Sequence, residues 1–116
     1  MSEPLLDRTI LSDLERRLGR EKVVRVVVAQ MTNGLELIQR MRALEVSPDR
    51  APVKALAHQI AGSSGCVGLL KLSRQAALLE HAADEIEPSA LATLVRDLRD
   101  CLEASQLVLR AEFPEI

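Results

Sequence analysis

The sequence contains almost no aromatic residues. Phe113 is the single one among 116 residues, and tryptophan and tyrosine are absent. Proteins that bind single-stranded nucleic acid use aromatic side chains on which bases stack, so this class is disfavoured. Aliphatic side chains and alanine make up most of the 47% of residues that are hydrophobic. An aliphatic core suits packed helices better than a β-sandwich or barrel, whose strands favour aromatic and β-branched residues.

An excess of charge of one sign is also missing. The chain has 15 basic and 17 acidic residues and a net charge of −2. This balance gives no broad electrostatic field for DNA, RNA or an anionic membrane, and none of these is expected as a partner. A local basic group is interrupted by acidic residues and is interpreted as a solvated helix face; it comprises Arg8, Arg16, Arg17 and Arg20.

Cysteine and histidine are scarce, with two of each. Cys66 and Cys101 form no CxxC pair and show no metal-ligand spacing with the histidines, so no metal site is expected. The sequence has no apolar run of membrane-spanning length, and its first residues, MSEPLLDRTI, lack the pattern of a signal peptide. We therefore expect a cytoplasmic protein with reduced thiols, in which Cys101 serves as a small apolar core residue.

Apolar residues do recur at helical spacing along most of the chain. They predict one domain over residues 1–116 with helices at roughly 7–18, 20–45, 50–64, 67–85 and 88–112. A chain of this size buries about two-thirds of its unfolded surface, which is enough for one core. The expected fold class is all-α. The four longer helices would form an antiparallel up-down four-helix bundle, and the short N-terminal helix would cover one end.

Turn residues mark most of the predicted helix ends. Gly19 and Gly65 are expected to stop the first and third helices, and Asp49 is expected to cap the third. Asn33-Gly34 usually signals a turn, but the apolar period continues through it, so a single second helix is favoured. The predicted buried face of that helix consists of Val24, Val27, Val28, Met31, Leu35, Ile38 and Met41.

Helix geometry predicts that His58 points into solvent. The core face of the third helix would be formed by Val53, Leu56, Ala57, Ile60 and Ser64. At about 100° per residue, His58 lies roughly 140° from the centre of that face. Its neighbours there include Ala55, Ala61 and Gly62, whereas a surface helix normally carries long polar side chains. A macromolecule could therefore approach His58 closely. The alternative is an ordinary surface histidine beside a loose helix end.

Two consecutive stretches resemble the histidine phosphotransfer (HPt) domain family. These are HQIAGSSGCVGL, from His58 to Leu69, and LSRQAALLE, from Leu72 to Glu80. The family pattern is a histidine, a lysine three residues later, Gly-Ser-Ser or a similar run, an apolar-Gly pair, and a helix that ends in an apolar-Glu pair. The match is strong over about 23 residues, and the order of the helices extends it over nearly the whole chain.

The resemblance implies that the protein relays a phosphoryl group between receiver-domain aspartates through phosphohistidine at His58. Gly62 matches the small residue over which a receiver docks, and Ala61, Ser63 and Gly65 belong to the same expected docking surface. The implied partners are response-regulator receiver domains and a hybrid sensor histidine kinase. No cofactor is expected on this chain, and Mg²⁺ is expected on the receiver. The protein is expected to be a monomer.

The chain departs from the family pattern at Ala61, where a phosphate-neutralising lysine is usual. Lys54 could supply a cation from the preceding turn, or it could be a solubilising surface residue. Glu80 could accept a hydrogen bond from Nδ1 of His58, or it could be solvated. Lys71 and Arg74 are weaker candidates for the cation. The second histidine, His81, is not surrounded by small residues and is interpreted as structural or incidental.

No nucleotide-binding segment such as GxxxxGK[ST] is present, so the chain should be a carrier without ATP-dependent kinase activity of its own. The alternative function is a non-phosphorylated helical adaptor that docks receiver or kinase domains, with Ala61 marking the loss of phosphorylation. A small metal-binding or redox protein is a third, weaker hypothesis.

Overall fold

The computed structural model describes residues 4–116; the first three residues of the segment inspected for a signal peptide lie outside the described part. The expected all-helical class is confirmed. The helices are α1 (Arg8–Leu18), α2 (Arg20–Ala43), α3 (Ala51–Cys66), α4 (Leu70–Ala82) and α5 (Pro88–Glu112). Among these residues, no helix is long and apolar enough to cross a membrane.

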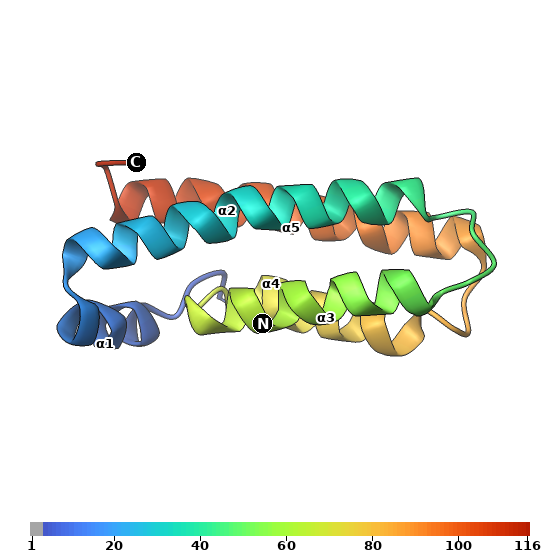
Figure 1. Cartoon of the computed structure of the whole chain (residues 1–116), viewed down its shortest axis with the longest axis horizontal. Coiled ribbons are helices and arrows are strands. Elements are labelled where there is room, and N and C mark those ends of the chain that lie inside the picture. Colours follow the sequence, from blue (N-terminus) through green and yellow to red (C-terminus); the bar gives the residue numbers. More distant parts are fainter. Residues whose placement is uncertain (1–3) are drawn as a thin grey trace.

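The four longer helices lie side by side (Figure 1). Helix α2 packs against α3 and α5, and α4 packs against the same two helices. Each helix runs opposite to the one before it, so that the connections alternate between the two ends of the molecule (Figure 1). The short helix α1 packs against α2, at the end where the α3–α4 turn and the C-terminus also lie.

The core between these helices is aliphatic, as the composition predicts. Every helix contributes to it, and the single aromatic residue, Phe113, closes it after the end of α5. Its largest fully buried side chains are Val23, Val27, Ile38, Met41, Ile60, Leu69, Leu72, Leu79, Leu91, Leu98, Leu102 and Leu109. Removing these side chains from water supplies the main driving force for folding.

Helix α2 is continuous through Asn33-Gly34, as predicted. Its predicted buried face was partly wrong, because Val28 and Leu35 are about 40% exposed. Gly34 is buried instead, and a Cβ there would lie 3.4 Å from Leu102 Cδ1 on α5. The missing side chain lets α5 pack directly against the backbone of α2. The contact between α2 and α5 therefore passes through Gly34, and Val28 and Leu35 lie to the side of it.

The α3–α4 turn differs from the prediction. Helix α3 continues through Gly65 to Cys66, and α4 begins at Leu70, later than expected. The residue with the left-handed conformation is Gly68, at φ +82°, where a Cβ would lie 2.7 Å from the carbonyl oxygen of Asp7. Asp7 also donates its amide hydrogen to Gly68 O at 2.8 Å. The turn is therefore shaped by its contact with the N-terminal segment, which periodicity along α3 cannot reveal.

The remaining helix ends lie close to their predicted positions. Gly19 follows α1 as expected and adopts φ +85°. Helices α2 and α4 end two and three residues before the predicted limits. Asp49 lies one residue before the N-cap of α3, which is Arg50, and its side chain accepts a hydrogen bond from the amide of Ala51 at 3.0 Å. Its carboxylate thus still satisfies one free amide of the first turn.

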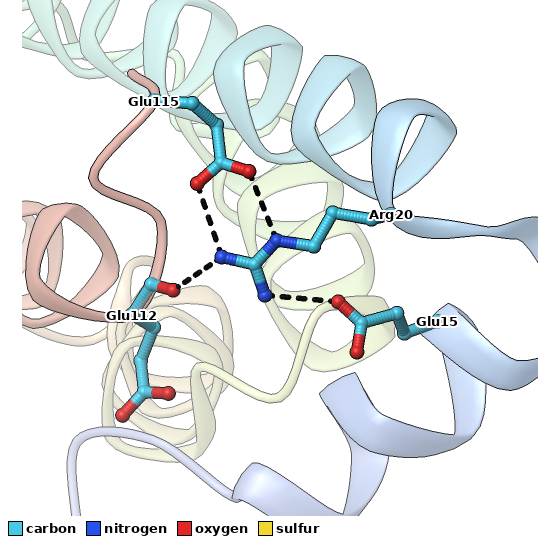
Figure 2. A network of polar contacts seen from close by, with 4 residues as sticks. All are labelled: Glu15, Arg20, Glu112 and Glu115. Atoms are coloured by element: carbon cyan, nitrogen blue, oxygen red, sulfur yellow. Dashed lines mark hydrogen bonds and ion pairs between the residues drawn. The ribbon is translucent and has the colours of Figure 1, made fainter.

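Arg20 joins α1, α2 and the C-terminus (Figure 2). It donates two hydrogen bonds to the carboxylate of Glu115, at 2.9 and 3.0 Å, and one to Glu15 at 2.9 Å. A further bond of 2.8 Å reaches the carbonyl oxygen of Glu112, and the guanidinium lies 4.6 Å from the centre of the Phe113 ring. The prediction that Arg20 belongs to a merely solvated face was therefore wrong. Since Glu112, Phe113 and Glu115 are distant from Arg20 in sequence, spacing could not reveal these contacts.

Two other arginines of that basic group are also paired. Arg8 forms an ion pair with Glu112 at 2.6 Å, and Arg16 pairs with Asp13. The basic group thus carries its own counter-charges, and part of it fastens α1 to the end of α5.

Candidate functional site

His58 projects from the third turn of α3 into solvent, as helix geometry predicted. Its side chain is 76% exposed, and its Nδ1 lies 3.2 Å from Oε1 of Glu80 on α4. An ionised carboxylate can only accept hydrogen bonds, so this contact is a hydrogen bond when Nδ1 carries the proton. No other hydrogen bond to the ring is present within residues 4–116.

A second polar contact between α3 and the end of α4 lies one helical turn away from the contact of His58 with Glu80. Lys54 Nζ lies 2.6 Å from Asp84 Oδ2. Lys54 precedes His58 by four residues, and Asp84 follows Glu80 by four, as expected where antiparallel helices meet. The hydrogen bond to Asp84 raises the pKa of Lys54, and the negative charge of Glu80 contributes in the same direction. The matched spacing of these four residues is a signal from which the sequence could have predicted Asp84.

The residues that follow His58 have small side chains, so the surface beside the imidazole is low. Gly62 is exposed, and a Cβ added to it would meet no atom within 4 Å. Ala61 is partly buried against the core, and its carbonyl oxygen accepts a hydrogen bond of 2.7 Å from Ser73 Oγ on α4. Ser63 is also partly buried, with its Oγ 3.4 Å from the carbonyl oxygen of Ile60. Gly62 is thus the residue that most directly opens the face beside the imidazole.

Gly65 lies against α4. A Cβ there would lie 3.3 Å from Ser73 Oγ, so a larger residue would push the two helices apart. Gly65 is partly buried, and its observed role is close packing between α3 and α4. Participation in docking stays a prediction for this residue.

Sequence reasoning missed a buried polar pair under the site. Gln30 on α2 is 5% exposed and Ser64 on α3 is fully buried. Gln30 Nε2 donates to Ser64 Oγ at 3.2 Å, whereas Gln30 Oε1 is buried without a partner. Gln30 was missed because polar residues are normally assigned to the surface. The pair fixes α3 against α2 below the face that carries His58.

An open, largely apolar hollow of about 320 Å³ adjoins this pair between α2 and α3. It is lined by Val26, Ala29, Gln30, Asn33, Ser63, Cys66 and Val67. Val26 is 41% exposed, and Cys66 is an exposed free thiol. Because Cys66 lies one turn beyond Gly62 on α3, the hollow continues the low surface beside His58. The sequence alone gave no indication that Val26 and Cys66 line a hollow.

The other chemically distinctive residues lie elsewhere. His81 is exposed on α4. Cys101 is buried in α5, and burial raises the pKa of its thiol. Within residues 4–116 there is no group of three or more His, Cys, Asp and Glu side chains that could hold a metal ion.

The fold and site define a helical domain with one surface histidine that hydrogen-bonds a carboxylate from the neighbouring helix. The family model described as Hpt domain matches residues 22–107, which is well over half of the chain. The chain therefore belongs to the Hpt domain family, whose members act in phosphotransfer during two-component signalling together with receiver domains and kinases. No curated protein and no solved structure matches the chain.

Proposed function

We propose that this protein is a histidine-containing phosphotransfer protein, which accepts a phosphoryl group on His58 from one receiver aspartate and passes it to another. The observation that carries the proposal is the exposed imidazole with its Nδ1 on Glu80. We further infer that α2–α5 constitute the up-down four-helix bundle expected for this role, with the site on the outer face of α3.

The contact with Glu80 selects the reactive nitrogen. In a neutral imidazole whose Nδ1–H points at a carboxylate, the lone pair resides on Nε2. Nε2 attacks the phosphorus of an aspartyl phosphate, the bond from phosphorus to the acyl oxygen breaks, and the receiver carboxylate leaves with the electron pair. Nδ1 keeps its proton, and Glu80 compensates the positive charge that the ring acquires. The return step reverses these changes on a second receiver.

Positioning is the main requirement of such a transfer, because phosphoryl transition states are loose and catalysis rests on alignment and charge. The low surface around Gly62 and the apolar hollow lined by Val26 and Cys66 would receive the partner. Ala61 and Ser63 would lie beneath it. Mg²⁺ is expected in the acidic pocket of the receiver, and no cofactor is assigned to this chain. A transient contact of modest area fits a carrier that must release its partner.

Lys54 is the proposed source of positive charge in place of the lysine missing at Ala61. In the unphosphorylated protein it is paired with Asp84. A phosphoryl group on His58 brings about two negative charges close to this pair. We propose that Lys54 then shares its ammonium group between Asp84 and the phosphoryl oxygens. The alternative is that Lys54 serves only the ion pair between α3 and the α4–α5 connection.

The rival function is a helical adaptor that docks receivers without being phosphorylated, and Ala61 is the observation that favours it. The two functions separate when the protein is incubated with phosphorylated receivers. The relay predicts an acid-labile, alkali-stable label on the wild type that is absent from His58→Gln, while His81→Gln keeps it. Receiver binding without label, from every receiver encoded in the same genome, would establish the adaptor instead.

A further inference from the structure

A second hollow lies between the end of α2 and the first half of α5. It has a volume of about 270 Å³ and is lined by Arg42, Glu45, Ala92, Arg96 and Arg99. His58 lies on α3, whereas this hollow belongs to the α2–α5 side (Figure 1). The proposed phosphotransfer does not use it.

The charge of this hollow is unbalanced. Three arginines line it together with one glutamate, in a chain whose net charge is −2, and Asp100 lies 3.6 Å from Arg99 as a second carboxylate. Neither Arg42 nor Arg96 forms an ion pair or a side-chain hydrogen bond within residues 4–116. Other arginines of the protein, such as Arg20 and Arg25, are held by carboxylates. Arg42 and Arg96 therefore lack the carboxylate partners that Arg20 and Arg25 have.

Arg99 supplies an independent observation. Its Nε–H is buried without an acceptor, which is costly for a charged group. Its one ion contact within residues 4–116 is a long one, 3.6 Å to Asp100, the next residue in the chain. Arg99 lines the hollow, and its side chain is 34% exposed. Nε–H itself is buried, and a change of side-chain rotamer would bring it to an acceptor in the hollow.

We propose that this hollow binds a small dianionic ligand of the phosphate type. Arg42 and Arg96, which have no ion-pair partner within residues 4–116, match the two charges of a dianion, and planar guanidinium groups donate paired hydrogen bonds to phosphate oxygens. The volume lies just below the range of about 300 to 1,000 Å³ typical of small-molecule sites, which suits inorganic phosphate or diphosphate. Such an ion would neutralise Arg42 and Arg96 and would satisfy the unpaired Nε–H of Arg99.

The test is a titration of the ¹⁵N-labelled protein, followed by amide chemical shifts at fixed pH and ionic strength. The probes are inorganic phosphate, inorganic diphosphate and succinate, a dicarboxylate of the same charge. Binding predicts saturable shifts confined to residues near 42–45 and 92–99. Arg96 is exposed, so Arg96→Gln should fold normally and should weaken phosphate binding at least about tenfold, as expected for one charge-assisted hydrogen bond.

A matched control is available on α1. A hollow of about 280 Å³ is lined there by Asp13, Arg16 and Arg17, but Arg16 is paired with Asp13 and no unpaired buried nitrogen is present. Arg17→Gln should leave phosphate binding unchanged, and so should His58→Gln, which separates this site from phosphotransfer. Shifts that rise linearly with concentration would overturn the proposal. Equal losses in Arg96→Gln and Arg17→Gln, or succinate binding as tight as phosphate, would do the same.

Discussion

His58 Nδ1 and Glu80 Oε1 lie 3.2 Å apart across the α3–α4 contact, with the imidazole exposed and the carboxylate half-buried. Glu80→Ala should reduce the rate of phosphotransfer by about three- to tenfold, because the ring loses its orientation and its preference for a proton on Nδ1. Glu80→Gln should be milder, since its amide oxygen still accepts a hydrogen bond. Nitrogen NMR of the imidazole should report the Nδ1–H form in the wild type and a mixture in Glu80→Ala. The same tautomer populations in the wild type and in Glu80→Ala would contradict the orienting role.

The ion pair of Lys54 with Asp84 predicts opposite effects from its two partners. Lys54→Gln should shorten the lifetime of phosphohistidine by about two- to fivefold, because exposed charge pairs contribute about 1 kcal/mol or less. Asp84→Asn should lengthen it, since Lys54 would be released from its competitor. The lifetime is measured by loss of label after the receiver is removed. If both variants match the wild type, Lys54 serves the ion pair alone.

Two substitutions at Gly62 test docking and stability separately. An added Cβ at this position meets no atom of the protein, so Gly62→Ala should raise the free energy of unfolding by about 1 kcal/mol through helix propensity. Gly62→Gln should fold equally well but should slow transfer from receivers at least about tenfold, because a long side chain would obstruct the partner. Thermal unfolding and transfer rates are measured on the same samples. Normal transfer by Gly62→Gln would remove Gly62 from the docking surface.

The buried pair of Gln30 and Ser64 should contribute to stability without touching the reaction. Ser64→Ala leaves the Gln30 amide buried and unpaired, which should lower the free energy of unfolding by about 1 to 3 kcal/mol. Urea denaturation measures this change. The double variant Gln30→Met, Ser64→Ala replaces both partners by apolar groups and should recover most of the loss. A further loss in the double variant would show that packing, and not the hydrogen bond, determines the result.

The contact of Arg20 with Glu115 predicts a pH dependence of stability. Hydrogen bonds from Arg20 lower the pKa of Glu115 from 4.5 to about 2. Because the folded pKa is below the unfolded one, the contribution is fully present above about pH 4.5 and is lost as the pH falls toward 2. Glu115→Gln should lower the midpoint of thermal unfolding at pH 7 and should approach the wild type as the pH falls below about 2. Added salt should reduce the difference at pH 7, since these side chains are exposed.

Much of the architecture was predictable because it depends on local spacing. The buried face of α3 and the orientation of His58 follow from about 100° of rotation per residue, and both were predicted correctly. The buried face of α2 was not, since Val28 and Leu35 look like core residues in a pattern that counts only hydrophobicity. The contact of Gly34 with Leu102 decides which arc of α2 is buried, and it joins residues far apart in the chain.

The residues of the candidate site were also predicted only in part. His58, Gly62 and Glu80 were found from their spacing and from resemblance to the HPt family, since they lie in one continuous stretch of chain. Gln30 was missed because its importance depends on Ser64, which belongs to another helix, and Asp84 was missed although its spacing from Glu80 matches that of Lys54 from His58. Polar residues of this kind are assigned to solvent until the packing of helices shows what they face.

By itself, the sequence determined the helical class, the exposed histidine and the low surface around Gly62, because each depends on neighbours within a few turns of one helix. Tertiary structure alone decided that Gly68 and not Gly65 shapes the turn, that Arg20 joins both ends of the chain, and that Arg42, Arg96 and Arg99 surround one hollow. The physical reason is that these relationships are set by how separate helices approach one another. The spacing of residues within a single helix does not show how that helix packs against the others.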